Sequence, residues 1–509
     1  MIRLNILQRN FNNLQSLKTF STSARRSATK KGIVVGVYEN GELTSAASRI
    51  NIESQGKVMD ILKVSDVRLG MTNLAHNLVP GYDVVSLVGA GAKGATMDAN
   101  ETLDRHNENI RIAAGRAAKQ LLDEGVAHIE VDPFTNAEAA AEGAILSVWN
   151  FDYLKSDENK KPEPNVVCSE KNEEDVWEKG RIKAEAQNFA RVLTQCPSNL
   201  MTPTHFVECV IDKLCPCGVQ VEARDRKWMK EQNMEAFLAM ATGSTEAPLM
   251  LEVAYCGGNP DAKPVILTGK GVTFDGHGVC HDRQCDPEFS ADMAGAAVVV
   301  ATIKAICELK VPVNVNAIIP LCENMPGGNA VAPGDVFTAL NGTTIRIDDT
   351  DHDGRIFLVD ALCYAARYKP CLTINVSTLH DSMRIALGTG ATGVFTLADH
   401  IWKDMSEAGA KSGDRLWRLP LWDHYRMKIQ SDGGADVTTV GKGLGGHPCS
   451  AAAFLKLFAP PSEFAHMDIS GTGRKSSGIN HPYLQRNLMT GRPVRTLVDF
   501  FCKFATNKS

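Results

Sequence analysis

The chain has 509 residues, of which 44% are hydrophobic and 22% charged, a globular composition long enough for two domains. A nucleic-acid-binding protein is usually basic, whereas the formal net charge here is −5. No apolar run approaches the roughly 18 residues of a membrane-spanning helix. We therefore expect neither nucleic acid nor a membrane as a partner.

The first 31 residues differ in composition from the rest of the chain. They contain seven Lys or Arg residues and no acid, and the first acidic residue is Glu39. Apolar residues recur there at helical spacing, at Leu4, Leu7, Phe11, Leu14 and Leu17. A Ser/Thr-rich stretch follows at residues 20–29. This pattern is typical of a mitochondrial transit peptide, and the alternative is a disordered basic tail. We predict residues 1–31 to be a transit peptide and the protein to lie in the mitochondrial matrix.

The 14 cysteines show no spacing typical of a disulfide framework, so buried thiols are the expected state for most of them. Cys215 and Cys217 are separated by a single proline, which is too close for a zinc knuckle.

Strand and helix patterns alternate after the leader. Short apolar strands are predicted at residues 32–38, 83–88 and 127–131, with a helix at 110–122. The polar residues 155–172 predict an exposed loop, followed by a long charged helix at 173–193. We place a smaller N-terminal α/β domain at residues 32–195.

Residues 89–94 (GAGAKG) match the glycine pattern of a dinucleotide-binding loop. No acidic residue at the end of a second strand supports that interpretation, so a tight turn is the simpler one.

The second half alternates more clearly. Strands are predicted at residues 265–268, 313–320 and 372–378, and helices at 292–308 and 354–368. This order predicts a C-terminal α/β domain at residues 196–509, with a mixed sheet covered by helices.

Three polar stretches lie where these elements meet. They are residues 269–275 (GKGVTFD), 291–297 (ADMAGAA) and 349–355 (DTDHDGR). Ligands of open α/β sheets bind beyond the carboxyl ends of the strands, where Lys270, Asp275 and Asp351 fall. Clustered carboxylates repel one another unless a cation lies between them, and oxygen ligands suit Mg²⁺, Mn²⁺ or Zn²⁺.

The third stretch also fits two simpler interpretations. Residues 349–360 carry acids at several ligand positions of a calcium-binding EF-hand loop, but position 12 is Asp360 instead of Glu. The preceding residues 341–347 indicate a turn and a strand, whereas an EF-hand needs a helix there. A solvated acidic turn is the other alternative, and it leaves Lys270 and Asp275 unexplained.

From about residue 190 to 500 the chain resembles the leucyl aminopeptidase (cytosol aminopeptidase) family. The resemblance rests on the three stretches above and on residues 417–422 (WRLPLW), 450–455 (SAAAFL), 465–471 (AHMDISG) and 494–498 (VRTLV). Residues 32 to about 190 resemble the family's N-terminal domain less specifically. The leader makes the chain similar to divergent mitochondrial members such as the sperm leucyl aminopeptidases of insects.

The resemblance implies a two-metal peptidase that removes N-terminal residues from peptides, and a homohexamer. It assigns the metal ligands, two Mn or Zn ions being expected, to Lys270, Asp275, Asp292, Asp351 and Asp353. Arg355 corresponds to the catalytic arginine that holds a bicarbonate ion in the family. Thr378 and Leu379 correspond to residues that line the substrate pocket.

The chain departs from the family pattern at three places. The family's second, catalytic lysine is replaced by Asp282 or Arg283 in a shortened loop. Asp353 stands where the family has a bridging Glu, which shortens the side chain by about 1.5 Å. His380 and Asp381 follow Leu379 where the family has Thr and Gly.

These departures leave two interpretations open: an active aminopeptidase with altered preference, or a non-catalytic member retained for its assembly. A further alternative is a new soft-metal site formed by His277, Cys280, His281 and Cys285. The simpler interpretation is that these loop residues bind no metal.

Overall fold

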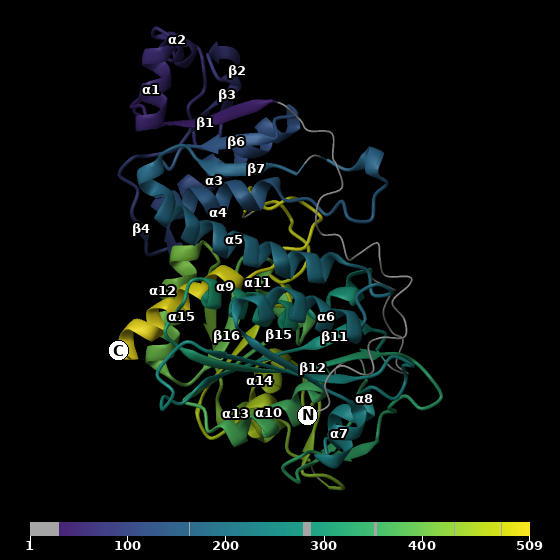
Figure 1. Ribbon diagram of the computed structural model, residues 1–509. Coiled ribbons are helices and arrows are strands. Elements are labelled where there is room, and N and C mark those ends of the chain that lie inside the picture. The colour runs from purple at the N-terminus through teal and green to yellow at the C-terminus, as the bar shows by residue number, and fades with distance from the viewer. Residues whose placement is uncertain are drawn as a thin grey trace.

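The computed structural model describes residues 30–161, 163–277, 287–350, 354–431, 433–479 and 481–508. Two α/β domains are stacked along the long axis of the molecule, the N-terminal one in purple and blue and the C-terminal one in teal to yellow (Figure 1). Within the described ranges, no helix is both long and apolar enough to cross a membrane. The predicted two-domain α/β architecture is confirmed.

The N-terminal domain is built on a five-stranded sheet in the order β2-β3-β1-β6-β7. Its strands are β1 (Lys31–Val37), β2 (Thr72–Val79), β3 (Tyr82–Gly89), β6 (His128–Val131) and β7 (Asn165–Cys168). The β2–β3 pair is antiparallel and the other pairs are parallel. Its helices are α1 (Ser45–Glu53), α2 (Lys57–Leu62), α3 (Arg105–Asp123) and α4 (Ala137–Val148). The loop predicted at residues 155–172 is therefore interrupted by β7, whose short apolar run pairs at the sheet edge.

The glycine-rich residues 89–94 form a packed turn. A Cβ atom on Gly89 would lie 2.2 Å from the carbonyl oxygens of Val67 and Arg68, so only glycine fits there. The chain then continues into the hairpin of β4 (Met97–Asp98) and β5 (Leu103–Asp104) before α3 begins. A dinucleotide site needs a helix that starts at the loop itself, so the turn interpretation holds.

The C-terminal domain contains a nine-stranded mixed sheet in the order β17-β16-β19-β15-β10-β12-β9-β8, with β11 paired to the far end of β12. Its strands are β8 (Gln220–Arg224), β9 (Leu249–Cys256), β10 (Val265–Gly269), β11 (Gly271–Asp275), β12 (Asn314–Asn324), β15 (Leu372–Ser377), β16 (Thr392–Thr396), β17 (Leu416–Leu419) and β19 (Glu463–Asp468). A separate three-stranded sheet contains β13 (Val336–Thr338), β14 (Thr344–Arg346) and β18 (Val437–Thr438).

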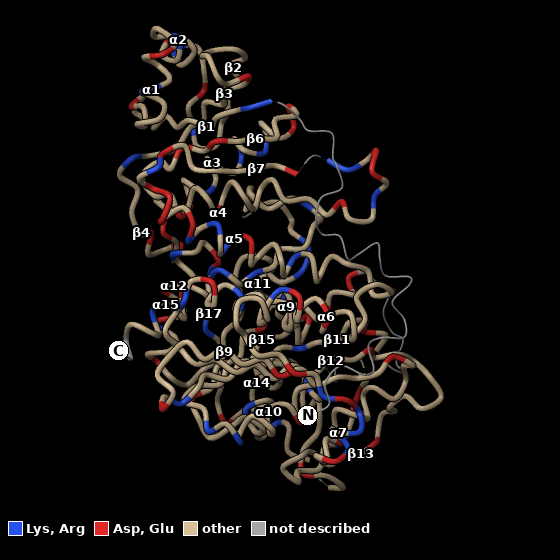
Figure 2. The backbone as a smooth tube through the Cα atoms, viewed as in Figure 1, with Lys and Arg blue, Asp and Glu red and all other residues tan. Residues whose placement is uncertain are grey.

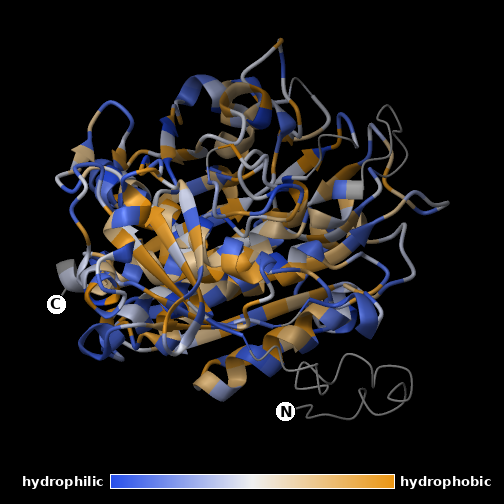
Figure 3. Ribbon diagram, turned by 90° about the horizontal axis from the view of Figure 1, so that it is seen from above, coloured by the Kyte–Doolittle hydropathy of each residue, from blue (hydrophilic) through white to orange (hydrophobic). Residues whose placement is uncertain are grey.

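Helices cover both faces of the large sheet. One face packs against α5 (Glu174–Gln195), α6 (Pro203–Leu214), α9 (Ala294–Glu308), α12 (Asp399–Ser412) and α15 (Val494–Lys508). The other packs against α7 (Arg226–Glu231), α8 (Glu235–Met240), α10 (Val359–Ala365), α13 (Asp423–Lys428) and α14 (His447–Phe458), while α11 (Asp381–Leu387) follows β15. Hydrophobic residues gather in the strands and in the helices against them (Figure 3).

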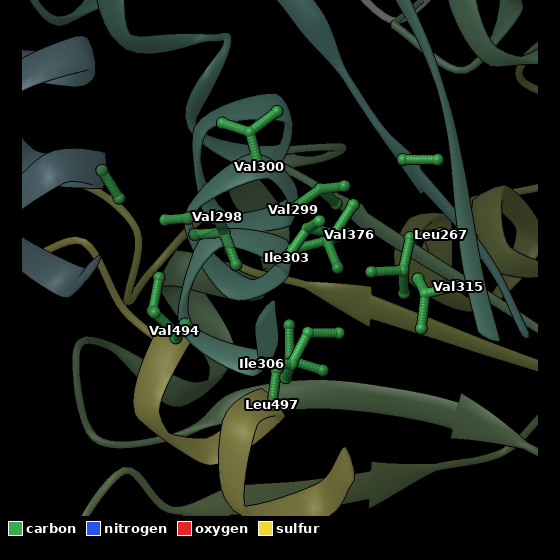
Figure 4. Packing of buried hydrophobic residues seen from close by; sticks show 14 of the residues in the cluster. Leu267, Val298, Val299, Val300, Ile303, Ile306, Val315, Val376, Val494 and Leu497 are labelled. Carbon is green, nitrogen blue, oxygen red and sulfur yellow. The ribbon is translucent and has the colours of Figure 1, made fainter. Parts of the chain in front are cut away.

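The core between α9 and the sheet is made of branched aliphatic side chains. Val299 and Ile303 of α9 point toward Val376 of β15, and Ile306 lies beside Leu497 of α15 (Figure 4). All of them are fully buried. Because α9 starts directly after Met293, this packing fixes the position of Asp292 at its beginning.

Helix α5 joins the two domains, since it packs on α4 in one domain and on α9 and α15 in the other. Acidic and basic positions lie side by side along this junction (Figure 2). Glu142 of α4 accepts hydrogen bonds of 2.6 Å from both Arg111 and Arg495. Asp499 accepts from Lys183 at 2.5 Å and from Lys411 at 2.9 Å. The domains are thus joined by buried ion pairs as well as by apolar packing.

Candidate metal centre

Lys270 and Asp275 lie at the carboxyl ends of two consecutive strands that both pair with β12. Lys270 directly follows β10, and Asp275 is the last residue of β11. A Cβ atom on Gly269 would lie 2.7 Å from the backbone of Gly295, and one on Gly295 would lie 2.1 Å from the carbonyl oxygen of Val376. The two glycines therefore allow the start of α9 to approach the strand ends, which brings Asp292 to the same place.

The lysine amine contacts both carboxylates. Lys270 Nζ forms an ion pair with Asp292 Oδ2 and lies 3.5 Å from Asp275 Oδ2. All three residues are at least 93% buried. A Cβ atom on Gly354 would lie 2.7 Å from Lys270 Nζ, so the glycine before Arg355 leaves space for the amine.

Neighbouring polar groups hold the two carboxylates in place. Asp275 Oδ1 accepts hydrogen bonds from Asn324 Nδ2 at 2.9 Å and from the backbone N–H of His277 at 3.1 Å. Thr378 Oγ1 donates to Asp292 Oδ1 at 2.5 Å. Asn324 was missed in the sequence because the predicted strand ended at residue 320, whereas β12 continues to Asn324.

Burial opposes ionisation of both carboxyl groups. At Asp275 the charges of Lys270 and His277 outweigh burial and lower the pKa to about 2. At Asp292 burial and the negative charge of Asp275 outweigh Lys270 and raise the pKa to about 7. The two carboxylates repel each other when both are ionised, and a divalent cation between them would relieve that repulsion, which fits a metal site.

Arg355 directly follows Gly354, the glycine that lies against Lys270. It is 1% exposed, and its guanidinium carbon is 5.9 Å from the ring centroid of Phe454. Burial, together with the Arg355 charge, lowers the pKa of His466 to about 3. The imidazole is therefore neutral, and its Nδ1 lies 2.8 Å from Asn375 Oδ1.

The predicted substrate-contacting segment follows β15. Thr378 and Leu379 are both buried, and Thr378 reaches Asp292 directly. His380 Nδ1 accepts a hydrogen bond of 3.0 Å from the backbone of Ser382, and its ring stacks on His447 with 5.0 Å between ring centroids. The imidazole that departs from the family pattern is thus fixed in place beside the site.

Several predicted residues lie outside the described ranges. They are Asp351, Asp353, Asp282, Arg283, Cys280, His281 and Cys285. Thr350, directly before residue 351, donates a hydrogen bond of 2.9 Å from Oγ1 to the carbonyl oxygen of His277. This bond joins Thr350 to the segment that follows β11. The neighbouring Asp349 lines a cavity of about 430 Å³ together with Arg346, Asp348, Ser431, Thr438, Val440, Gly441 and Lys442.

The EF-hand alternative is wrong. Asp360, at its position 12, is fully buried and accepts hydrogen bonds from the backbone N–H groups of Phe237 and Leu340, both at 2.9 Å. The segment before the acids contains strand β14 instead of a helix.

Comparisons with known proteins agree with this fold. The catalytic domain of the cytosol aminopeptidase family matches residues 188–498, and the family's N-terminal domain matches residues 34–158. The cytosol aminopeptidase of Sus scrofa is 40% identical over 492 residues, which cover 94% of each chain. The bottromycin maturation enzyme BotP, solved in complex with Mn, is 28% identical with a TM-score of 0.79 and covers 93% of this chain and 99% of its own. A mutant of tomato leucine aminopeptidase shares the fold, with 24% identity, a TM-score of 0.78 and 95% of each chain covered.

Proposed function

Because the chain belongs to the cytosol aminopeptidase family, we propose that it is a leucyl aminopeptidase-like metalloprotein whose peptidase activity is weakened or lost. The observation that carries the proposal is the buried contact of Lys270 with both Asp275 and Asp292. These three residues match the family pattern, whereas the departures fall on the catalytic lysine, on the bridging ligand at Asp353 and on the substrate wall at His380.

Lys270, Asp275 and Asp292 would hold two divalent cations, Mn or Zn, together with Asp351 and Asp353. A solved relative that contains Mn supports this choice. Such ions, when bound, would lower the pKa of a bound water and polarise the peptide carbonyl. Arg355 would hold a bicarbonate ion as the base, and its burial keeps the guanidinium away from competing solvent.

We expect weakened activity because the residues around the Lys270, Asp275 and Asp292 cluster differ from the family pattern. A positive group on the carbonyl oxygen is worth roughly 10²–10³ in rate when compared with other oxyanion donors. The corresponding position holds Asp282 or Arg283. His380, which stacks on His447, stands at a position where the family contacts the substrate backbone. If the site is active, its substrates are peptides with a free N-terminus.

The alternative is a non-catalytic assembly protein of mitochondria, built on the homohexamer of the family. Exposed aromatic side chains at the outer edge of the large sheet favour self-association. Trp417 on the edge strand β17 is 57% exposed and Trp422 is 64% exposed. The basic, acid-free leader favours import into the matrix.

Two measurements on the purified protein test the proposal: a metal count, and the rate of hydrolysis of Leu-p-nitroanilide with Mn or Zn. We expect bound metal with little or no turnover. Turnover comparable to that of the cytosol aminopeptidases, abolished by Arg283→Ala, would overturn the weakened site and identify the substitute cation. Absence of bound metal would overturn the ligand assignment.

A further inference from the structure

The Cys-Pro-Cys segment belongs to the C-terminal domain and lies outside the metal centre. It forms the short 3-10 helix η3 (Cys215–Cys217), which directly follows α6. Cys215 is exposed, and Cys217 is partly buried. The neighbouring element is the last turn of α9, which carries Cys307 and Glu308.

One contact joins Cys217 to Cys307, and a second joins Cys217 to the residue next to Cys307. Cys307 Sγ donates to the carbonyl oxygen of Cys217 at 2.8 Å. Cys217 Sγ lies 3.8 Å from Glu308 Oε1 on the residue next to Cys307. A disulfide needs Cα atoms about 4.4–6.8 Å apart. That span is compatible with the sulfur of one cysteine touching the backbone of the other.

We propose that Cys217 and Cys307 are a reversible disulfide site that reacts with a small-molecule disulfide such as glutathione disulfide. The Cys217 thiolate attacks one sulfur of the small disulfide, which forms a mixed disulfide and releases one thiolate. The Cys307 thiolate then attacks Cys217 Sγ and releases the second. Two protein thiols become one disulfide, and the small disulfide is reduced to two thiols. This inference does not depend on the proposed function.

The fold selects Cys307 over Cys215 as the partner of Cys217. Cys215 and Cys217 are two residues apart in a helical turn, so their side chains point in different directions. Cys215 is directed to solvent, whereas Cys217 packs against the core beside α9. A bridge to Cys215 would have to disrupt η3.

The surroundings also set the speed of the reaction. Burial and the Glu308 carboxylate raise the pKa of Cys217, and burial and the Cys217 thiol raise that of Cys307. The attacking thiolates are therefore scarce at neutral pH, so we expect slow exchange that accelerates as the pH rises. The bridge would tie the end of α9 to the end of α6, and α9 begins two residues after Asp292.

The test uses the full-length protein, glutathione disulfide at pH 8, and three cysteine variants. Non-reducing peptide mapping should find a Cys217–Cys307 cross-link and the loss of the Cys217 and Cys307 thiols. The matched control Cys215→Ser should form the same cross-link. Cys307→Ser and Cys217→Ser should not form it. The melting temperature should rise on oxidation of the wild type and of Cys215→Ser and fall back with dithiothreitol, because the cross-link restricts the unfolded chain.

A Cys215–Cys217 cross-link, or an unchanged thiol count in protein that retains its native circular dichroism, would overturn the proposal. Cross-linking that persists in Cys307→Ser would do the same.

Discussion

Arg495 on the C-terminal helix donates to Glu142 of the N-terminal domain at 2.6 Å, and neither side chain is more than 1% exposed. The same carboxylate oxygen accepts from Arg111 Nε, so one buried acid joins an arginine from each domain. The domain arrangement therefore depends on a charge cluster that neither domain completes alone.

Replacing Glu142 with Gln should destabilise the protein by about 3–5 kcal/mol, because two buried guanidinium groups lose their shared carboxylate. Denaturant unfolding followed by circular dichroism measures this loss. Glu178→Gln is the matched control, since Glu178 pairs with Arg181 on the outer surface of α5 with a 49% exposed side chain. The control should cost less than about 1 kcal/mol. Equal effects of the two substitutions would contradict the role of the cluster.

The contribution of Glu142 should disappear in acid. Burial opposes its ionisation, but the charges of Arg111 and Arg495 lower its pKa from 4.5 to about 2. A carboxyl group with a lowered folded-state pKa stabilises fully above its unfolded pKa and loses that contribution as the pH falls. The stability difference between wild type and Glu142→Gln should thus be constant above about pH 5 and shrink toward pH 2. A difference that stays constant over this range would refute the assignment.

We expect the protein to bind divalent metal although its peptidase activity is weakened or lost. Mn or Zn should raise the melting temperature by an amount that grows with the free metal concentration, while peptidase turnover stays low. Asp275→Asn should abolish the shift, because Asp275 is part of the buried cluster around Lys270. Asp399→Asn, at an aspartate with a 90% exposed side chain outside the site, should keep the full shift. A shift retained in Asp275→Asn would place the metal elsewhere.

The leader should be removed on import. Mass spectrometry of the protein from purified mitochondria should find an N-terminus between Thr19 and Gly32, at the end of the Ser/Thr-rich stretch. An intact Met1 on the organellar protein would contradict the transit-peptide prediction.

The protein should be a homohexamer in solution. Native mass spectrometry at micromolar concentration checks this, and Trp422→Glu tests the exposed aromatic edge by placing a charge where a neighbouring subunit would pack. We expect the wild type to be hexameric and the variant to form smaller species. A stable wild-type monomer would contradict the assembly.

Local sequence patterns predicted much of the C-terminal domain. The apolar runs at residues 265–268 and 372–378 became β10 and β15, and the helix predicted at 292–308 became α9. Buried parallel strands need continuous apolar residues, so short windows of sequence identify them. The family motifs likewise identified Lys270, Asp275 and Asp292 as a cluster, and the structure brings these three together.

Other relationships depend on the tertiary structure alone. Asn324 reaches Asp275 only because β12 extends past its apolar run and pairs with β11. Glu142 and Arg495 are 353 positions apart, and Cys217 and Cys307 are 90 apart. No local pattern around these residues identifies their partners. Their partners are determined by how α4, α9 and α15 pack on the sheets, and helix packing depends on the whole core instead of on any local pattern.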